Sequence, residues 1–202
     1  RSNYWLSSKT TMKFFTSDTH FYHKNVIKYS NRPYENIEEM HEDMIDRWNR
    51  VIGKGDLVYH LGDFSLESNP ELIDAILGRL NGKIILIRGN HDKWLDKIDR
   101  VKHNNKFIKI ADYYETNIQH KDGTHIKASL MHYPMYTWNR SHYGSIQLHG
   151  HSHGAIDAQN RKLRRMDVGV DSEYGQFSPT PETFIADVMT QPEREFSFHH
   201  GD

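Results

Sequence analysis

The chain has hydrophobic and polar positions that repeat with two different periods, one typical of strands and one of helices. Short apolar runs at residues 13–17, 57–61 and 83–87 predict buried strands. Between these runs, residues 37–52 and 70–80 place apolar side chains at helical spacing, and a glycine follows each segment closely. Strand–helix alternation of this kind predicts βαβ units and a mainly parallel sheet.

The second half of the chain has a different pattern. Residues 112–119 and 124–131 flank a His-Lys-Asp-Gly segment, and because Asp-Gly indicates a turn, a β-hairpin is predicted there. Residues 146–149 and 166–170 predict two further strands, and residues 181–188 predict a late helix. The simplest account of the whole pattern is one α/β domain with two sheets.

The first eleven residues fit neither period. Residues 1–11 also lack the cationic and then apolar layout of a signal peptide. Met12 opens the run Met-Lys-Phe-Phe-Thr, which has the pattern of a natural start followed by a first strand. We therefore expect residues 1–11 to be a leader outside the fold and residues 12–202 to form a single domain.

Composition narrows the class of protein. A net charge of −1 over 202 residues argues against broad electrostatic capture of duplex DNA or of an anionic membrane. No apolar run in the sequence approaches the roughly 20 residues that a membrane-spanning helix needs. The lack of cysteine excludes disulfides and thiolate metal sites, and it fits a reducing compartment. Histidine occurs 15 times, and since it is the commonest metal ligand, its positions are informative.

Polar clusters follow the predicted strands at the points where the strands end. Because ligands gather beyond the carboxyl ends of strands in open α/β sheets, these side chains are expected to converge on one site. Carboxylate, imidazole and amide oxygen without thiolate suit divalent Mn, Fe, Co, Ni or Zn. Two ions about 3.5–4 Å apart need a bridging carboxylate and several further ligands. The candidate ligands are Asp18, His20, Asp63, Asn90, His132, His151 and His153.

Each of these motifs is weak evidence by itself. An Asp-x-His occurs by chance in many chains, and a single histidine in a strand is more often a core residue with its hydrogen bonds satisfied. Gly-Asn-His-Asp and Gly-His-x-His are more specific. Glycines beside Asp63, Asn90 and His151 allow the backbone to turn sharply and to approach ions closely. The ordered combination at successive strand ends therefore favours metal chemistry.

The order of the motifs resembles the signature of the calcineurin-like metallophosphoesterases, which is D-x-H, G-D, G-N-H-D, H and G-H-x-H. The resemblance runs from Met12 to about Ile185. It implies an α/β fold, a four-layer αββα sandwich of two mixed β-sheets flanked by helices, with a dimetal site at the sheet ends. Segments 18–25, 31–34 and 132–145 are similar to a small bacterial and phage branch of this family.

The resemblance also implies a role for each site residue. One ion would be bound by Asp18, His20, Asp63 and His153, and the other by Asp63, Asn90, His132 and His151. Asp63 would bridge two divalent ions, with Mn²⁺ expected first and Fe, Ni, Co or Zn as alternatives. A hydroxide shared by the ions would attack phosphorus. His91 would bind no metal and would protonate the leaving group, while Asp92 would orient the His91 ring or cap a helix.

Residues close to these motifs are candidates for substrate binding. The loop 133–145 connects two strands that carry metal ligands, so we expect it to form a wall of the substrate site. For His23 and Asn25 the alternative is a loop cap, and for Arg32 it is a surface ion pair that contributes little. The candidates are His23, Asn25, Arg32, Trp138, Asn139 and His142.

These inferences predict a metal-dependent phosphoesterase. A phosphodiester is favoured, as a small molecule or short nucleotide, because the chain has little length for a cap and the groove should be open. The alternatives are a phosphomonoesterase on a nucleotide or phosphoprotein, and a non-catalytic scaffold, which the intact ligand set and His91 disfavour. We expect no membrane or duplex DNA partner, and a cytoplasmic location, in the host if the chain is phage-encoded. The sequence does not indicate the oligomeric state.

Overall fold

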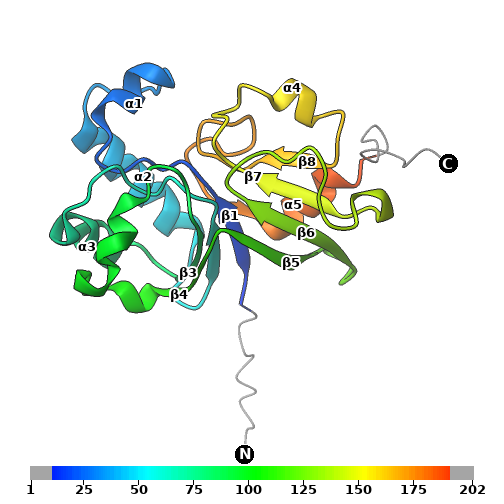
Figure 1. Ribbon diagram of the computed structural model, residues 1–202, viewed down its shortest axis with the longest axis horizontal. Helices are drawn as coiled ribbons and strands as arrows, with labels where there is room; N and C mark the ends of the chain where they lie inside the picture. Colours follow the sequence, from blue (N-terminus) through cyan, green and yellow to red (C-terminus); the bar gives the residue numbers. More distant parts are fainter. Residues whose placement is uncertain (1–10, 192–202) are drawn as a thin grey trace, which may run out of the picture.

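The computed structural model describes residues 11–191, which contain two β-sheets (Figure 1). The first sheet has the strand order β4-β3-β2-β1-β9, and β1 to β4 are parallel while β9 runs antiparallel to β1. Its strands are β1 (Lys13–Thr16), β2 (Leu57–His60), β3 (Lys83–Ile87), β4 (Phe107–Ala111) and β9 (Thr180–Pro181).

The second sheet has the order β5-β6-β7-β8. Its strands are β5 (Tyr113–Gln119), β6 (His125–Met131), β7 (Ile146–His149) and β8 (Arg165–Asp167). β5 and β6 form an antiparallel hairpin, whereas β6, β7 and β8 are parallel. The hairpin turn is closed by the amide of Gly123, which donates to the carbonyl of His120 at 3.0 Å. The predicted α/β fold with two mixed sheets is therefore confirmed.

Helices surround both sheets. In Figure 1, α1, α2 and α3 lie together on one side of the first sheet, and α4 lies beside β7 and β8. The α-helices are α1 (Lys24–Tyr29), α2 (Ile37–Val51), α3 (Pro70–Arg79), α4 (Asp157–Asn160) and α5 (Glu182–Met189), and the 3-10 helices are η1 (Lys93–Arg100), η2 (Asn104–Lys106) and η3 (Ser141–Tyr143). Within residues 11–191, no helix is both long enough and apolar enough to cross a membrane.

Apolar side chains of the first sheet are divided between two cores. Phe14 and Ile84 belong to the core that includes Trp48 of α2, whereas Phe15 and Ile85 belong to the core shared with the second sheet. Successive side chains of a strand point to opposite faces, so a strand buried on both faces must be apolar throughout. This explains the short continuous apolar runs in the first half of the sequence.

The loop 133–145 and α4 both contact the outer face of the second sheet. Gln147 on β7 is buried, and its amide nitrogen donates to the carbonyl of Tyr133 at 3.3 Å while its oxygen accepts from the amide of Met135 at 3.3 Å. Arg165 on β8 donates to the carbonyl of Met135 at 2.9 Å. These contacts fix the loop that follows β6 against the sheet.

Most predicted elements are confirmed to within one or two residues. Both ends are correct for the strands at 83–87 and 146–149. The strand predicted at 166–170 is wrong in its second half, because β8 ends at Asp167. The chain then leaves β7 and approaches β1, where the amide of Val170 donates to the carbonyl of Ser17 at 3.0 Å.

The strand β4 was not predicted. It pairs with β3 at the edge of the first sheet, and two of its five side chains are exposed while the others are half-buried. An edge strand with this exposure has no continuous apolar run to mark it. The predicted leader at 1–11 falls almost entirely outside the described residues, as do residues 192–202, so the limits of the domain stay predictions.

Candidate dinuclear metal site

The candidate metal ligands lie at the carboxyl ends of strands from both sheets. Four come from the first sheet and three from the second: Asp18 and His20 after β1, Asp63 after β2, Asn90 after β3, His132 after β6, and His151 and His153 after β7. Backbone hydrogen bonds join neighbouring loops within each set. The amide of Asp18 donates to the carbonyl of Gly62 at 2.9 Å, and the amide of Gly150 donates to the carbonyl of His132 at 3.0 Å.

Five of the seven candidate ligands have a left-handed backbone conformation. Their φ angles are 56° for Asp18, 50° for His20, 54° for Asp63, 67° for His151 and 46° for His153. This conformation is uncommon for residues other than glycine and costs on the order of 1–3 kcal/mol at each position. Strain of this kind clusters at functional sites, where the surrounding structure maintains it.

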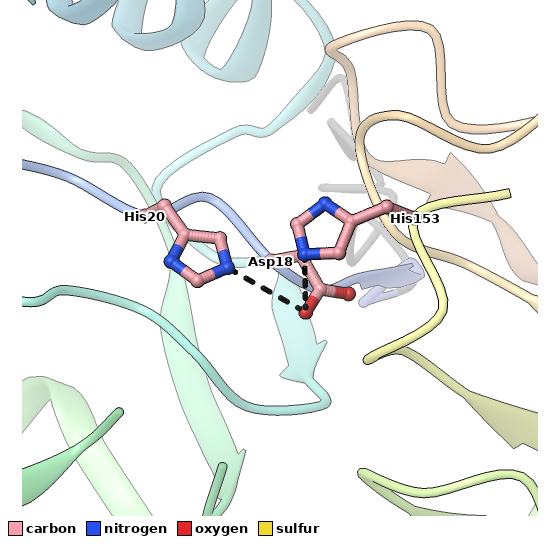
Figure 2. Close-up of side chains that lie close together, drawn as sticks. All are labelled: Asp18, His20 and His153. Atoms are coloured by element: carbon pink, nitrogen blue, oxygen red, sulfur yellow. Dashed lines mark ion pairs between the residues drawn. The ribbon is translucent and has the colours of Figure 1, made fainter. Parts of the chain in front are cut away.

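One cluster consists of Asp18, His20 and His153. Figure 2 shows both imidazole rings directed at the carboxylate of Asp18. The Nε2 atoms of His20 and His153 each lie 4.0 Å from Asp18 Oδ1. His20 Nε2 also lies 3.6 Å from Asp63 Oδ2. The carboxylate of Asp63 therefore lies next to this cluster.

The other cluster consists of Asp63, His132 and His151, whose ligand atoms lie within 4.8 Å of one another. His132 Nε2 is 3.4 Å from Asp63 Oδ2 and 3.1 Å from Asn90 Oδ1. The same oxygen of Asp63 thus approaches a histidine of each cluster. This is the position that a bridging carboxylate requires.

The environment of the His20 Nε2 atom indicates whether these residues suit a metal ion. It is buried and has no hydrogen-bond partner, although an unpaired buried polar atom costs about 1–3 kcal/mol. Burial lowers the pKa of His20 to about 2, so the ring is neutral and can offer a lone pair. A divalent cation between His20 and the two carboxylates would be its partner, and imidazole and carboxylate ligands fit such an ion.

Electrostatic interactions in the site are strong because the carboxylates are buried. Burial, with the nearby charge of Asp167, raises the pKa of Asp18 to about 7. Burial acts in the same direction on Asp63, but the hydrogen bond with His132, the charges of His132 and His20 and the hydrogen bond from the His91 amide together outweigh it and lower the pKa to about 2. Burial opposes a charge on His132, whereas the hydrogen bond with Asp63 and the charge of Asp18 raise its pKa to about 9. Two buried carboxylates therefore lie close together in the site, and a divalent cation would favour the charged form of both.

Two of the histidine ligands are held by acceptors on the far side of their rings. His153 Nδ1 lies 2.6 Å from Asp171 Oδ2, and His132 Nδ1 lies 2.8 Å from the carbonyl oxygen of Leu61. Contacts of this kind fix the orientation and tautomer of a metal-binding histidine. In both residues they leave Nε2 facing the carboxylates.

Arg32 is buried, so its predicted contact with substrate, and the alternative of a surface pair, are both wrong. Its guanidinium donates to both oxygens of Asp171 at 2.8 Å. It also donates to the carbonyl oxygens of Asp18 at 2.7 Å and Thr19 at 3.0 Å. Arg32 therefore holds the left-handed loop after β1 and the carboxylate that orients His153.

His91 lies beside the clusters without belonging to either. Its backbone amide donates to Asp63 Oδ1 at 2.8 Å, and its Nε2 is 4.0 Å from Asp63 Oδ2. The side chain is 39 % exposed, so the ring can reach a molecule that approaches from solvent. This placement suits the predicted role of a proton donor.

Asp92 does not orient the His91 ring as predicted, because its carboxylate is occupied elsewhere. It accepts hydrogen bonds from the backbone amides of Asp63 and Phe64 at 2.8 Å and of Gly89 at 2.9 Å. The indole of Trp94 donates a further bond at 3.0 Å. Asp92 instead fixes the loops that follow β2 and β3, which carry Asp63 and His91.

The ring of the candidate substrate residue His23 lies beside the first cluster. Its Nδ1 lies 3.2 Å from Nδ1 of His20, and its ring centre is 5.9 Å from that of His91. Asn25 is exposed on α1, and its predicted contact with substrate stays a prediction.

The loop 133–145 is only partly available to substrate. Trp138 is buried and its indole donates to the carbonyl of Ser145 at 3.2 Å, so the predicted substrate contact of Trp138 is wrong and its ring forms the interior of the loop. The amide of Asn139 donates to Glu115 on β5 at 3.0 Å, and the His142 ring lies 4.2 Å from that of Tyr143. The roles of Asn139 and His142 stay predictions.

Tyr133, the first residue of the loop 133–145, lies at the site, although it was not among the single residues predicted to bind substrate. Its hydroxyl donates to Asn90 Oδ1 at 3.4 Å, and its ring centre is 4.7 Å from that of His151 and 5.0 Å from that of His132. The side chain is 41 % exposed. Its position directly after His132 is the signal that could have identified it.

Two glycines allow the loops that carry the candidate ligands to approach each other closely. A Cβ atom on Gly62, which has a φ of +100°, would lie 2.6 Å from His132 Nδ1 and 2.7 Å from the amide of Gly89. A Cβ atom on Gly89 would overlap the backbone and carboxylate of Asp63. Any larger residue at these positions would therefore displace candidate ligands.

Two mixed sheets with paired carboxylate–imidazole clusters at their strand ends define a class, the α/β metalloenzymes with a dinuclear centre. The profile of the calcineurin-like phosphoesterase superfamily domain matches residues 12–191, which is almost the entire chain. The chain belongs to this superfamily, and it is a metal-dependent phosphoesterase.

Comparison with individual proteins agrees with this assignment. An uncharacterized protein of Methanocaldococcus jannaschii is 46% identical over 99 residues, which are 48% of this chain and only 56% of that protein. The Gene 66 protein of Mycobacterium phage L5 is 28% identical over 207 residues, with 92% of this chain and 98% of the phage protein covered. It supports the predicted phage branch.

A solved structure supports the fold. The crystal structure of a protein of unknown function from Aquifex aeolicus matches with a TM-score of 0.65 at 25% identity. The match covers 88% of this chain and 99% of the other. The similarity therefore extends over both sheets and is not limited to the metal motifs.

Proposed function

We propose that this protein hydrolyses a phosphodiester of the nucleotide type. The observation that supports this most is the shared oxygen of Asp63, which lies 3.6 Å from His20 Nε2 and 3.4 Å from His132 Nε2. Around it, His91 and Tyr133 are partly exposed and His151 is exposed, so the centre is open toward solvent. An open centre can admit a phosphate that carries an ester group on both sides.

The residues that would hold two divalent ions are Asp18, His20, Asp63, Asn90, His132, His151 and His153. We propose Mn²⁺ as the natural ion, with Fe, Ni, Co or Zn as alternatives that the same ligands would accept. When bound, the two ions would neutralise charge on the phosphate and acidify the water that attacks it.

His91 is the proposed general acid. Its exposed ring can carry a proton at Nε2 to the oxygen of the leaving group, a contribution of roughly 10²–10⁴-fold to the rate. Asp92 positions His91 indirectly, because its carboxylate fixes the loop from Gly89 onward. The Tyr133 hydroxyl lies near Asn90, where it can donate to a phosphate oxygen.

The proposal includes the setting in which the protein acts. The partner would be a phosphoester small molecule or a short nucleotide, and neither duplex DNA nor a membrane is expected, since the net charge is −1. A cytoplasmic location is proposed, and it would be the host cytoplasm if the gene belongs to a phage like the Gene 66 relatives.

Hydrolysis of bis-(p-nitrophenyl) phosphate and of p-nitrophenyl phosphate in the presence of Mn²⁺ tests the proposal. We expect a higher kcat/KM for the diester, and turnover of the monoester alone would support the alternative, a phosphomonoesterase on a nucleotide or phosphoprotein.

Asp63→Asn should lose metal and both activities. The matched control is Asp46→Asn, an exposed carboxylate on α2. A panel of cyclic nucleotides, dinucleotides and short RNA would then identify the substrate.

A further inference from the structure

Three imidazole rings meet at one edge of the site. The ring centres of His20, His23 and His91 are separated by 5.1 Å (His20–His23), 5.4 Å (His20–His91) and 5.9 Å (His23–His91). His20 is buried, His23 is half-buried and His91 is partly exposed. The rings therefore extend from the metal ligands toward the surface at which substrate arrives.

The contact between His20 and His23 joins two nitrogen atoms of the same kind. Their Nδ1 atoms are 3.2 Å apart, so one must carry a proton and the other a lone pair. His20 Nε2 faces Asp18 and Asp63 without a hydrogen-bond partner, and it is the nitrogen that would bind an ion. A nitrogen that binds a metal carries no proton, so the His20 proton lies on Nδ1 and is donated to His23.

This arrangement determines the tautomer of His23 as well. Since His23 accepts at Nδ1, its own proton must be on Nε2. Within residues 11–191, the contacts of the His23 ring are the hydrogen bond to His20 and ring contacts with His20, Tyr29 and His91, and none of them gives Nε2 a hydrogen-bond acceptor.

We propose that His23 fixes the tautomer of His20 and presents its Nε2–H, beside His91, as a hydrogen-bond donor to a phosphate oxygen of the substrate. The other two supported ligands differ, because Asp171 and the carbonyl of Leu61 only accept from His153 and His132. A histidine that accepts on one side donates on the other, so it connects the metal ligand to the substrate. The part that concerns phosphate rests on the proposed function, whereas the part that concerns the tautomer needs only metal binding.

Substitutions at His23 can separate the two parts of the proposal. In His23→Asn, the amide oxygen can replace Nδ1 as acceptor, but the donor at the Nε2 position is lost. In His23→Gln, the amide nitrogen can replace Nε2 as donor, but the acceptor is lost. His23→Phe removes both groups, and His125→Asn is the matched control at an exposed histidine on β6.

Titration calorimetry of the metal-free protein with Mn²⁺ tests the first part. We expect His23→Phe and His23→Gln to lower the affinity by about 10–100-fold, as loss of a group that supports a metal-binding histidine does. His23→Asn and the control should stay close to the wild type. Wild-type affinity in both His23→Phe and His23→Gln would overturn the tautomer assignment.

Binding of inorganic phosphate to the Mn²⁺-loaded protein tests the second part. Loss of one hydrogen bond predicts an affinity about tenfold lower for His23→Asn and His23→Phe. His23→Gln, measured with enough Mn²⁺ to saturate it, should bind phosphate nearly as the wild type does. Unchanged phosphate affinity in His23→Asn would overturn the donor role.

Nuclear magnetic resonance of ¹⁵N-histidine-labelled, Zn²⁺-loaded protein reports the tautomers directly. We expect a proton on Nδ1 of His20 and on Nε2 of His23, and a proton on Nδ1 of His23 would refute the inference. A wild type that hydrolyses no phosphoester would refute the proposed function, yet lower Mn²⁺ affinity in His23→Phe would still support the tautomer assignment. If the wild type is active but His23→Phe binds Mn²⁺ with unchanged affinity, the tautomer assignment is refuted and the proposed function is not affected.

Discussion

At the scale of single residues, His91 differs from the other histidines of the site. Its Nε2 lies 4.0 Å from Asp63 Oδ2, and its side chain is 39 % exposed, whereas His20 and His132 are buried between carboxylates. The backbone amide of His91, and not its ring, makes the hydrogen bond to Asp63. The ring can therefore be removed without loss of a metal ligand.

We predict that His91→Ala keeps both metal ions and lowers kcat by about 10²–10⁴-fold, because a general acid is lost. Calorimetric titration with Mn²⁺ and steady-state kinetics on the same preparations measure the two effects. His125→Ala is the control at an exposed position. Weaker metal binding would place His91 among the ligands, and full activity would remove it from the acid role.

His60 makes stability depend on pH. It is fully buried between the Thr19 hydroxyl, 3.0 Å from its Nε2, and the Gly62 amide, which donates to its Nδ1 at 3.3 Å. Burial lowers its pKa from 6.5 to about 3. The unfolded chain therefore binds a proton between these two pH values that the folded protein does not bind.

Because the unfolded state takes up more protons in this range, the free energy of unfolding decreases as pH falls below 6.5. The contribution of His60 between pH 6.5 and pH 5 is about 2 kcal/mol. Urea unfolding at a series of pH values should show a shallower dependence for His60→Gln than for the wild type. An identical slope would mean that His60 is protonated in the fold, and His125→Gln provides the comparison.

The sequence predicted the candidate ligands but not the residues that support them. Metal motifs combine local spacing with a strand end, and both can be recognised in a sequence. The functions of Arg32, Asp92 and Asp171 depend on partners that are distant along the chain, as in the Arg32–Asp171 pair separated by 139 positions. No local pattern predicts such a pair, so the sequence suggested substrate binding for Arg32, with a surface ion pair as the alternative, and orientation of the His91 ring or a helix cap for Asp92.

At the scale of elements, one buried ion pair joins two segments that support the first cluster. Arg32 lies between α1 and α2, and Asp171 lies in the segment after β8. Both side chains are at most 5 % exposed. Removal of one partner would leave the other charge buried and unpaired.

We predict that Arg32→Ala lowers the free energy of unfolding by about 3–5 kcal/mol. It should also weaken Mn²⁺ binding, since Asp171 would no longer hold His153. Urea unfolding and calorimetry measure the two effects. The matched control is Arg50→Ala, which breaks an exposed pair with Asp46 and should change stability by less than about 1 kcal/mol. Equal effects of the two substitutions would contradict the importance of burial.

The predictability of an element follows from its burial. β2 and β3 are buried on both faces and were found from their apolar runs, whereas the edge strand β4 was not. β8 was predicted too long because Val168 and Val170 are apolar and buried. They are buried in different cores, the first between the sheets and the second on the helix side, after the chain has left the strand.

At the scale of the whole molecule, the site joins the two sheets. The first sheet supplies both carboxylates, whereas the second supplies histidines alone. Bound ions would therefore connect the two layers across their common core. Each ion present at 100 times its dissociation constant would add about 2.7 kcal/mol to the free energy of unfolding.

We predict that a chelator lowers the melting temperature and that added Mn²⁺ restores it. Differential scanning calorimetry with and without the chelator measures this shift. Asp63→Asn lacks the shared carboxylate and should respond to neither treatment, whereas Asp46→Asn should respond as the wild type does. A melting temperature of the wild type that is independent of metal would contradict a link between the sheets.

The order of the ligands along the chain has a consequence for biosynthesis. Asp18 and His151 are adjacent in the fold, where the amide of His151 donates to Asp18 Oδ2 at 3.0 Å, but they are 133 positions apart in sequence. At about 5–20 residues per second, a ribosome needs on the order of ten seconds to synthesise the chain between them. A nascent chain therefore exposes both carboxylates before it has any histidine of the second sheet. The full set of candidate ligands therefore exists only after His153 has been synthesised.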